Sequence, residues 1–100
     1  MKQEPTRKAS AALVDLRRQI DAIDSELVAL IARRQRCVEQ VIEIKRAEKL
    51  PARIPERIEE VLARVRALAE AEKLEPDLAV ALWREMMERF IAYEERALEG

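Results

Sequence analysis

The chain has 100 residues, of which 39% are charged and 49% hydrophobic, and its 19 Lys and Arg residues nearly balance its 20 Asp and Glu residues. Charges of both signs are interspersed, which argues against nucleic-acid binding, and no apolar stretch reaches the length of a membrane span. With no histidine, one cysteine and one glycine, the composition excludes zinc sites, histidine-dependent catalytic triads and glycine-rich nucleotide loops.

These features predict one cytoplasmic all-α domain that binds neither membrane nor nucleic acid. Polar residues around Pro5 indicate a flexible N-terminal tail, assigned to residues 1–12, ahead of a helical domain over residues 13–98. Ser10 is the expected N-cap of a first helix that continues to about Leu50, where Pro51 ends it. Cys37 lies on the apolar face of this helix, which predicts a buried thiol.

Two further helices follow, each with a proline in its first turn. Pro55 is expected to begin the second helix, which runs to about Lys73, and Pro76 to begin the third. The second helix carries an apolar face made of Ile58, Val61, Leu62, Val65, Leu68 and Ala69. The third carries Ala79, Leu82, Trp83, Met86, Met87, Phe90 and Ile91, and Glu94 continues this face one turn later.

The first helix is too long for a compact monomer. About 36 residues at 1.5 Å each extend roughly 54 Å, against a diameter on the order of 35 Å for a compact domain of this size. Apolar residues recur along it at helical spacing, namely Leu13, Leu16, Ile20, Ile23, Leu27, Leu30, Val38, Val41 and Ile42. This stripe needs a second chain, so a symmetric homodimer is expected.

Charged residues interrupt these apolar faces, and they are the candidate functional residues. Arg34 and Lys45 lie eleven residues apart, within about 20° of one direction on the first helix. Two cations in an apolar seam predict a site for a small dicarboxylate, because arginine binds carboxylates bidentately and lysine adds a point charge. The pattern alone leaves a second interpretation equally open, in which these charges fix helix register and Glu94 pairs with Arg34 or Lys45.

The motif LRxxIDxIDxxLxxLxxRR, from Leu16 to Arg34, with Lys45 eleven residues further on, resembles the all-helical chorismate mutases. The resemblance extends from Leu13 to about Ala97 and includes Pro55, Glu56 and Arg57. It implies an intertwined homodimer of three-helix chains with active sites shared between subunits. It also implies an isomerase that converts chorismate to prephenate without a cofactor, a step of the shikimate pathway toward aromatic amino acids.

The resemblance further implies roles for individual residues. Arg17 would reach one substrate carboxylate from the partner subunit, Arg34 would bind the other, and Arg57 would lie at the mouth of the site. Lys45 would donate to the ether oxygen while its C–O bond breaks. Glu94 would lie on the other side of that oxygen, where many members of the family have glutamine.

Two positions depart from the mutase pattern and keep other functions open. Ile54 and Ile58 stand where bacterial mutases often have acidic residues that contact the ring hydroxyl of the substrate. Ile58 resembles instead the related isochorismate pyruvate lyases, which form salicylate on the same scaffold. The sequence therefore favours a mutase, with a lyase as the alternative enzyme and a non-catalytic helical dimerisation module as the alternative of another class.

Overall fold

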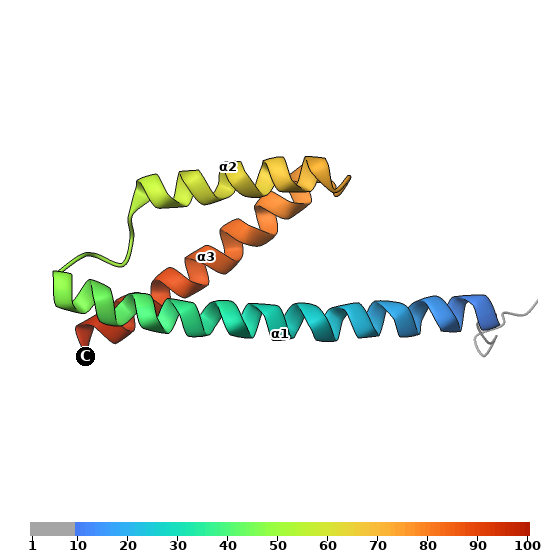
Figure 1. The fold of residues 1–100 in the computed structure, drawn as a ribbon, viewed down its shortest axis with the longest axis horizontal. Helices are drawn as coiled ribbons and strands as arrows, with labels where there is room; N and C mark the ends of the chain where they lie inside the picture. Colours follow the sequence, from blue (N-terminus) through green and yellow to red (C-terminus); the bar gives the residue numbers. More distant parts are fainter. Residues whose placement is uncertain (1–9) are drawn as a thin grey trace, which may run out of the picture. The chain divides into compact units, whose positions relative to one another are not determined.

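A computed structural model describes residues 10–100, which form three helices and no strand (Figure 1). The helices are α1 (Ala11–Glu48), α2 (Pro55–Ala71) and α3 (Pro76–Glu99). The all-α prediction with a very long first helix is therefore confirmed. The chain divides into two compact units, one that ends at Arg34 and one that covers residues 35–100, and each is described by itself.

Helix α1 begins where the sequence predicts. The backbone N–H of Leu13 donates to Ser10 Oγ at 3.2 Å, and the N–H of Val14 donates to the Ser10 carbonyl at 3.0 Å. Ser10 is thus the N-cap, with its hydroxyl satisfying one of the free N–H groups of the first turn. Of the predicted tail, residues 1–9 lie outside the described part of the chain, whereas Ala11 and Ala12 already belong to the helix.

Helices α1 and α2 each end two residues before the predicted position, for the same reason. Lys49 and Lys73 have positive φ angles of 59° and 60°. The residue after each lysine donates back to a carbonyl five positions earlier, at 2.9 Å from Leu50 to Lys45 and at 2.8 Å from Leu74 to Ala69. These contacts are those of Schellman motifs, which usually carry glycine at this position. With lysine in its place, the sequence gives little signal for either helix end.

Prolines begin the other two helices, as predicted. Pro55 and Pro76 occupy the first helical positions, where a missing N–H costs nothing. Glu75 caps α3, because its carboxylate accepts a hydrogen bond of 2.7 Å from the backbone N–H of Asp77. The cap residue of α2, Ile54, is extended and has no side-chain hydrogen bond to the helix.

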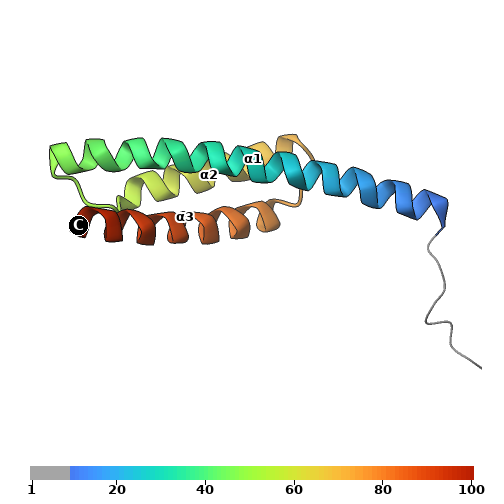
Figure 2. The same cartoon turned by 90° about the horizontal axis from the view of Figure 1, so that it is seen from below.

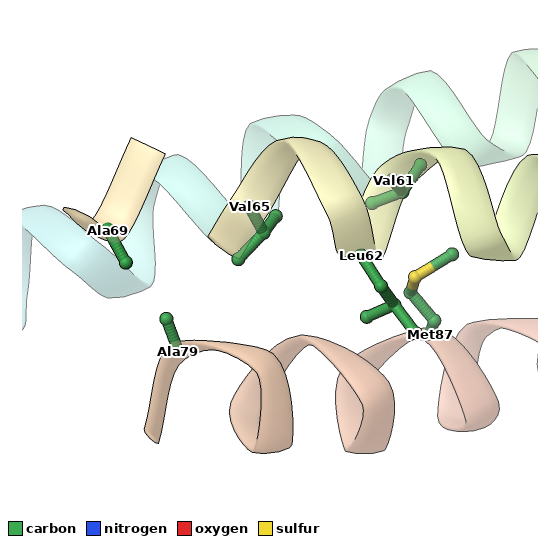
Figure 3. Close-up of a cluster of buried hydrophobic side chains, with 6 residues drawn as sticks. All are labelled: Val61, Leu62, Val65, Ala69, Ala79 and Met87. Carbon is green, nitrogen blue, oxygen red and sulfur yellow. The ribbon is translucent and has the colours of Figure 1, made fainter. Parts of the chain in front are cut away.

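The apolar faces of α2 and α3 pack against one another and form the core of the second unit. Figure 3 shows this cluster, in which Leu62 lies beside Met87 at one end and Ala69 faces Ala79 at the other. The small alanines let the two helices approach closely near the turn that joins them. Ile58, Val80 and Trp83 pack against the cluster from its edge. Of the predicted faces, Leu68 and Leu82 remain exposed.

Helix α1 exposes most of its apolar stripe in the single chain. Its large exposed hydrophobic residues in the first unit are Leu13, Val14, Leu16, Ile20, Ile23, Leu27, Val28, Leu30 and Ile31. In the second unit, Ile42 is buried but Val41 and Ile44 are exposed. Cys37 is exposed as well, so the prediction of a buried thiol is wrong for the chain by itself. Cys37 lies on the apolar stripe but stays exposed, because no apolar residues within the described part of the same chain pack over it.

Candidate active site

Lys45 and Glu94 form a buried ion pair between α1 and α3. Lys45 Nζ lies 2.7 Å from Glu94 Oε1, and the two side chains are only 12% and 9% exposed. Each charge lies one turn along its helix from a buried isoleucine on the same face, Ile42 on α1 and Ile91 on α3. The apolar packing that buries these isoleucines thus also brings the two charges together.

The loop between α1 and α2 supplies a second acceptor for the lysine. Lys45 Nζ donates to the backbone carbonyl of Ala52 at 2.7 Å, and Ala52 itself is buried. An ammonium has three N–H donors, so the carbonyl and the Glu94 carboxylate use two of them. The third can donate to a bound molecule, and in these apolar surroundings that interaction would be stronger than in water.

Two further contacts on either side of the ion pair join the end of α1 to the last turns of α3, which lie side by side in Figures 1 and 2. The Tyr93 hydroxyl donates to Glu39 Oε2 at 3.1 Å, and Arg46 Nη2 donates to the Ala97 carbonyl at 2.7 Å. The hydrogen bond to Glu39 raises the pKa of Tyr93, because the carboxylate favours the protonated phenol. These contacts restrict sliding of α3 against this end of α1.

Three predicted site residues lie together at the start of α2. The Ile54 carbonyl accepts hydrogen bonds from the backbone N–H groups of Arg57 at 3.0 Å and Ile58 at 3.2 Å, which closes the first turn of the helix. Arg57 is exposed and its Nη1 lies 2.7 Å from Glu60 Oε1. Ile54 is half-buried, and Ile58 packs against the core between α2 and α3.

The two remaining predicted residues belong to the first unit. Arg17 is exposed and Arg34 is half-buried. The structure therefore brings Lys45 and Glu94 into contact and places Ile54, Arg57 and Ile58 on one helical turn. The roles assigned to all seven residues stay predictions.

The chemistry available at the ion pair is the binding and stabilisation of negative charge. Lys45 is a cation held in place by the neutral carbonyl of Ala52 and the carboxylate of Glu94. A fixed cation of this kind stabilises charge that develops on a substrate oxygen during a reaction. Among residues 10–100, no group of three or more acidic or cysteine side chains could hold a metal ion, and no helix is long and apolar enough to cross a membrane.

Comparison with known proteins identifies the family. Residues 16–95 match the family described as chorismate mutase type II. The chain belongs to the type II chorismate mutase family. A chorismate mutase from Methanocaldococcus jannaschii is 29% identical over 87 residues, which cover 87% of this chain and 88% of that protein.

Two T-proteins are also similar to this family member. The T-protein of Enterobacter agglomerans is 42% identical over 77 residues, and that of Haemophilus influenzae is 39% identical over 83 residues. These regions cover 77% and 83% of this chain, but only 21% and 22% of the T-proteins. The chain thus spans about a fifth of the length of these relatives.

Sequence reasoning missed the contribution of Ala52 to the site of this family member. Its contribution is a backbone carbonyl, which every residue carries, so its side chain gives no signal. The Tyr93–Glu39 contact was missed for a different reason. The two residues are 54 positions apart, and their contact follows only from the way α3 packs on α1.

Proposed function

We propose that the protein is a chorismate mutase that rearranges chorismate to prephenate without a cofactor. The observation that carries this proposal is the buried Lys45–Glu94 pair, which places a fixed cation beside a carboxyl group at the positions where the family resemblance expects the ether oxygen to bind. The pair alone would also suit a purely structural role. Membership of the type II chorismate mutase family over residues 16–95 favours catalysis.

The proposed mechanism requires a held conformation and a preorganised charge, but no nucleophile. Arg34 and Arg17 of the partner subunit bind the two substrate carboxylates and hold the flexible substrate in a shape that brings its reacting carbons together. Lys45 then donates its remaining N–H to the ether oxygen. Negative charge grows on this oxygen as its C–O bond breaks, so the interaction is stronger in the transition state than in the ground state.

Glu94 has to change its role when substrate binds. In the chain by itself it accepts a hydrogen bond from Lys45, as a carboxylate does. To donate to the ether oxygen from the other side, the carboxyl group must be protonated, because a carboxylate only accepts hydrogen bonds. The protonated form of Glu94 is therefore the active one.

The second copy of the chain is part of this proposal. Nine large hydrophobic residues of α1 are exposed between residues 13 and 31, along half of the helix. Monomeric proteins seldom expose so long an apolar face, and a matching face on a second copy would cover it. The resulting homodimer would bring Arg17 of the partner subunit to the site that contains Lys45.

Turnover of chorismate by the purified protein tests the function. The parent and Lys45→Met are compared by following the loss of chorismate absorbance, with Lys73→Met as a matched control at an exposed position. Because methionine keeps much of the packing and removes the charge, we expect Lys45→Met to lose activity while Lys73→Met keeps it. A parent protein that leaves chorismate unchanged would refute the proposal.

The same assay with isochorismate distinguishes the mutase from the lyase. The reason to include it is Ile58, an apolar residue packed against the core at a position where the resemblance expects an acidic contact to the ring hydroxyl. We expect prephenate from chorismate and no salicylate or pyruvate from isochorismate. Faster release of pyruvate from isochorismate would assign the protein to the lyase function instead.

A further inference from the structure

The loop between α1 and α2 has little regular structure to hold it, although it carries the acceptor for Lys45. Residues 51–54 are neither helix nor strand, and the Ala52 carbonyl that accepts from Lys45 Nζ lies in their middle. The methyl group of Ala52 is buried but small, so its packing restrains the loop only weakly. The place of the ammonium group therefore depends on what else fixes this loop.

The next residue, Arg53, connects the loop to α3 through two hydrogen bonds. Its Nη1 lies 3.0 Å from Glu88 Oε2 and its Nη2 lies 2.7 Å from Glu88 Oε1. A bidentate contact between a guanidinium and a carboxylate fixes orientation as well as distance. Glu88 stands six residues before Glu94 on α3, so one helix supports both the loop and the partner of Lys45.

Both groups of this contact are charged at neutral pH. The hydrogen bond from Arg53 holds the pKa of Glu88 below its ordinary value, and the hydrogen bond to Glu88 raises the pKa of Arg53. The contact is thus present above the ordinary pKa of a glutamate and is lost as the pH falls through the lowered pKa of Glu88. Protonation does not break it under the conditions in which an enzyme of this kind is assayed.

We propose that Arg53 and Glu88 are positioning residues, which hold the loop on α3 so that the Ala52 carbonyl keeps the Lys45 ammonium beside Glu94. This inference rests on the proposed function and extends it to two residues outside the substrate site. Both side chains are nearly half exposed, so their pair contributes little to global stability. Its effect is expected on the rate, because a small displacement of a catalytic group has a large cost in turnover.

The test uses Arg53→Ala, Glu88→Ala and the double variant of the full chain. Arg66→Ala is the matched control, since Arg66 forms a similar exposed ion pair with Asp77, between α2 and α3. We expect each single variant to lower kcat about 3- to 10-fold with little change in KM, because Lys45 acts in the transition state. The double variant should lose no more than either single variant, since the two residues act as one pair.

Hydrogen exchange of the backbone N–H groups in residues 49–54 gives a second readout. Exchange there should be faster in Arg53→Ala than in the parent, and unchanged in Arg66→Ala. An unchanged kcat in Arg53→Ala, losses that multiply in the double variant, or an equal loss in Arg66→Ala would each overturn the inference. A parent without turnover would refute the proposed function itself, and faster exchange would then show that the pair anchors the loop without a catalytic consequence.

Discussion

Glu94→Gln separates two roles of this residue, its ion pair in the structure and its part in the proposed mechanism. In the chain by itself Glu94 is the anionic partner of Lys45, whereas the mechanism needs it as a hydrogen-bond donor. Glutamine has nearly the same shape, keeps a carbonyl oxygen that accepts from Lys45, and adds an N–H group that donates at every pH. The substitution should therefore weaken the ion pair while it preserves the donor.

The expected loss of stability follows from the burial of the pair. Both side chains are about nine-tenths buried, so solvent screens the charges little. Removing one partner of a buried ion pair costs about 3–5 kcal/mol, because the other charge stays buried without compensation, and the hydrogen bond that glutamine keeps with the ammonium offsets about 1.5–3 kcal/mol of this cost. Glu94→Gln should therefore lower the free energy of unfolding by about 1–2 kcal/mol, measured by denaturant unfolding at one protein concentration.

At alkaline pH the same variant should be more active than the parent, although it is less stable. In the parent only the protonated carboxyl donates, so the rate should fall as the pH rises, by about tenfold per pH unit once the proton is lost. In Glu94→Gln the profile should be flatter, with activity kept at neutral and alkaline pH. The control is Glu95→Gln, which makes the same charge change at an exposed neighbour and should keep the profile of the parent.

Two results would refute this reasoning about Glu94. One is a parent profile that stays flat from acidic to mildly alkaline pH. The other is a glutamine variant that is inactive at every pH although it is folded. Either result would show that the residue does not donate to the substrate.

Three other predictions concern stability, assembly and metal dependence. Lys73→Gly should raise the free energy of unfolding by about 0.5–1 kcal/mol, because glycine adopts the positive φ of 60° without strain. Glu72→Gly is the control and should lower the free energy of unfolding, because Glu72 has an ordinary φ of −91°. Thermal unfolding measures both variants. Sedimentation should show a dimer at micromolar concentration, and a folded monomer there would contradict the shared site. Dialysis against a chelator should leave turnover unchanged, since no step of the proposed reaction uses a metal, and a loss restored by added metal would contradict this.

The sequence predicted the helices well because their signals are local. Ser10, Pro55 and Pro76 each act within one turn of their own position, through a side-chain cap or a fixed backbone angle. The ends of α1 at Glu48 and of α2 at Ala71 were placed two residues late, since Lys49 and Lys73, at positive φ, carry none of the signal that glycine would. The packed faces of α2 and α3 followed from apolar spacing alone.

The candidate site could be predicted only in part, because some of its contacts come from a loop and not from a helical pattern. Helical spacing identified Lys45 and Glu94 as charges on apolar faces, and their pairing was one of the alternatives that the pattern left open. Ala52 and the contact between Arg53 and Glu88 depend on the path of a loop, which no periodic pattern describes. Charged residues are so common in this chain that spacing does not distinguish a bidentate pair from a solvated one.

The central claim, a chorismate mutase site shared between two subunits, is tested most directly by mixing two inactive variants. Arg17→Ala and Arg34→Ala should each abolish turnover and keep the helical fold, measured by circular dichroism. After the subunits are exchanged at equal concentrations, half of the dimers are mixed and each of these has one intact site, so about a quarter of the parental activity should return. Two folded variants that exchange subunits and yet recover no activity would contradict the claim.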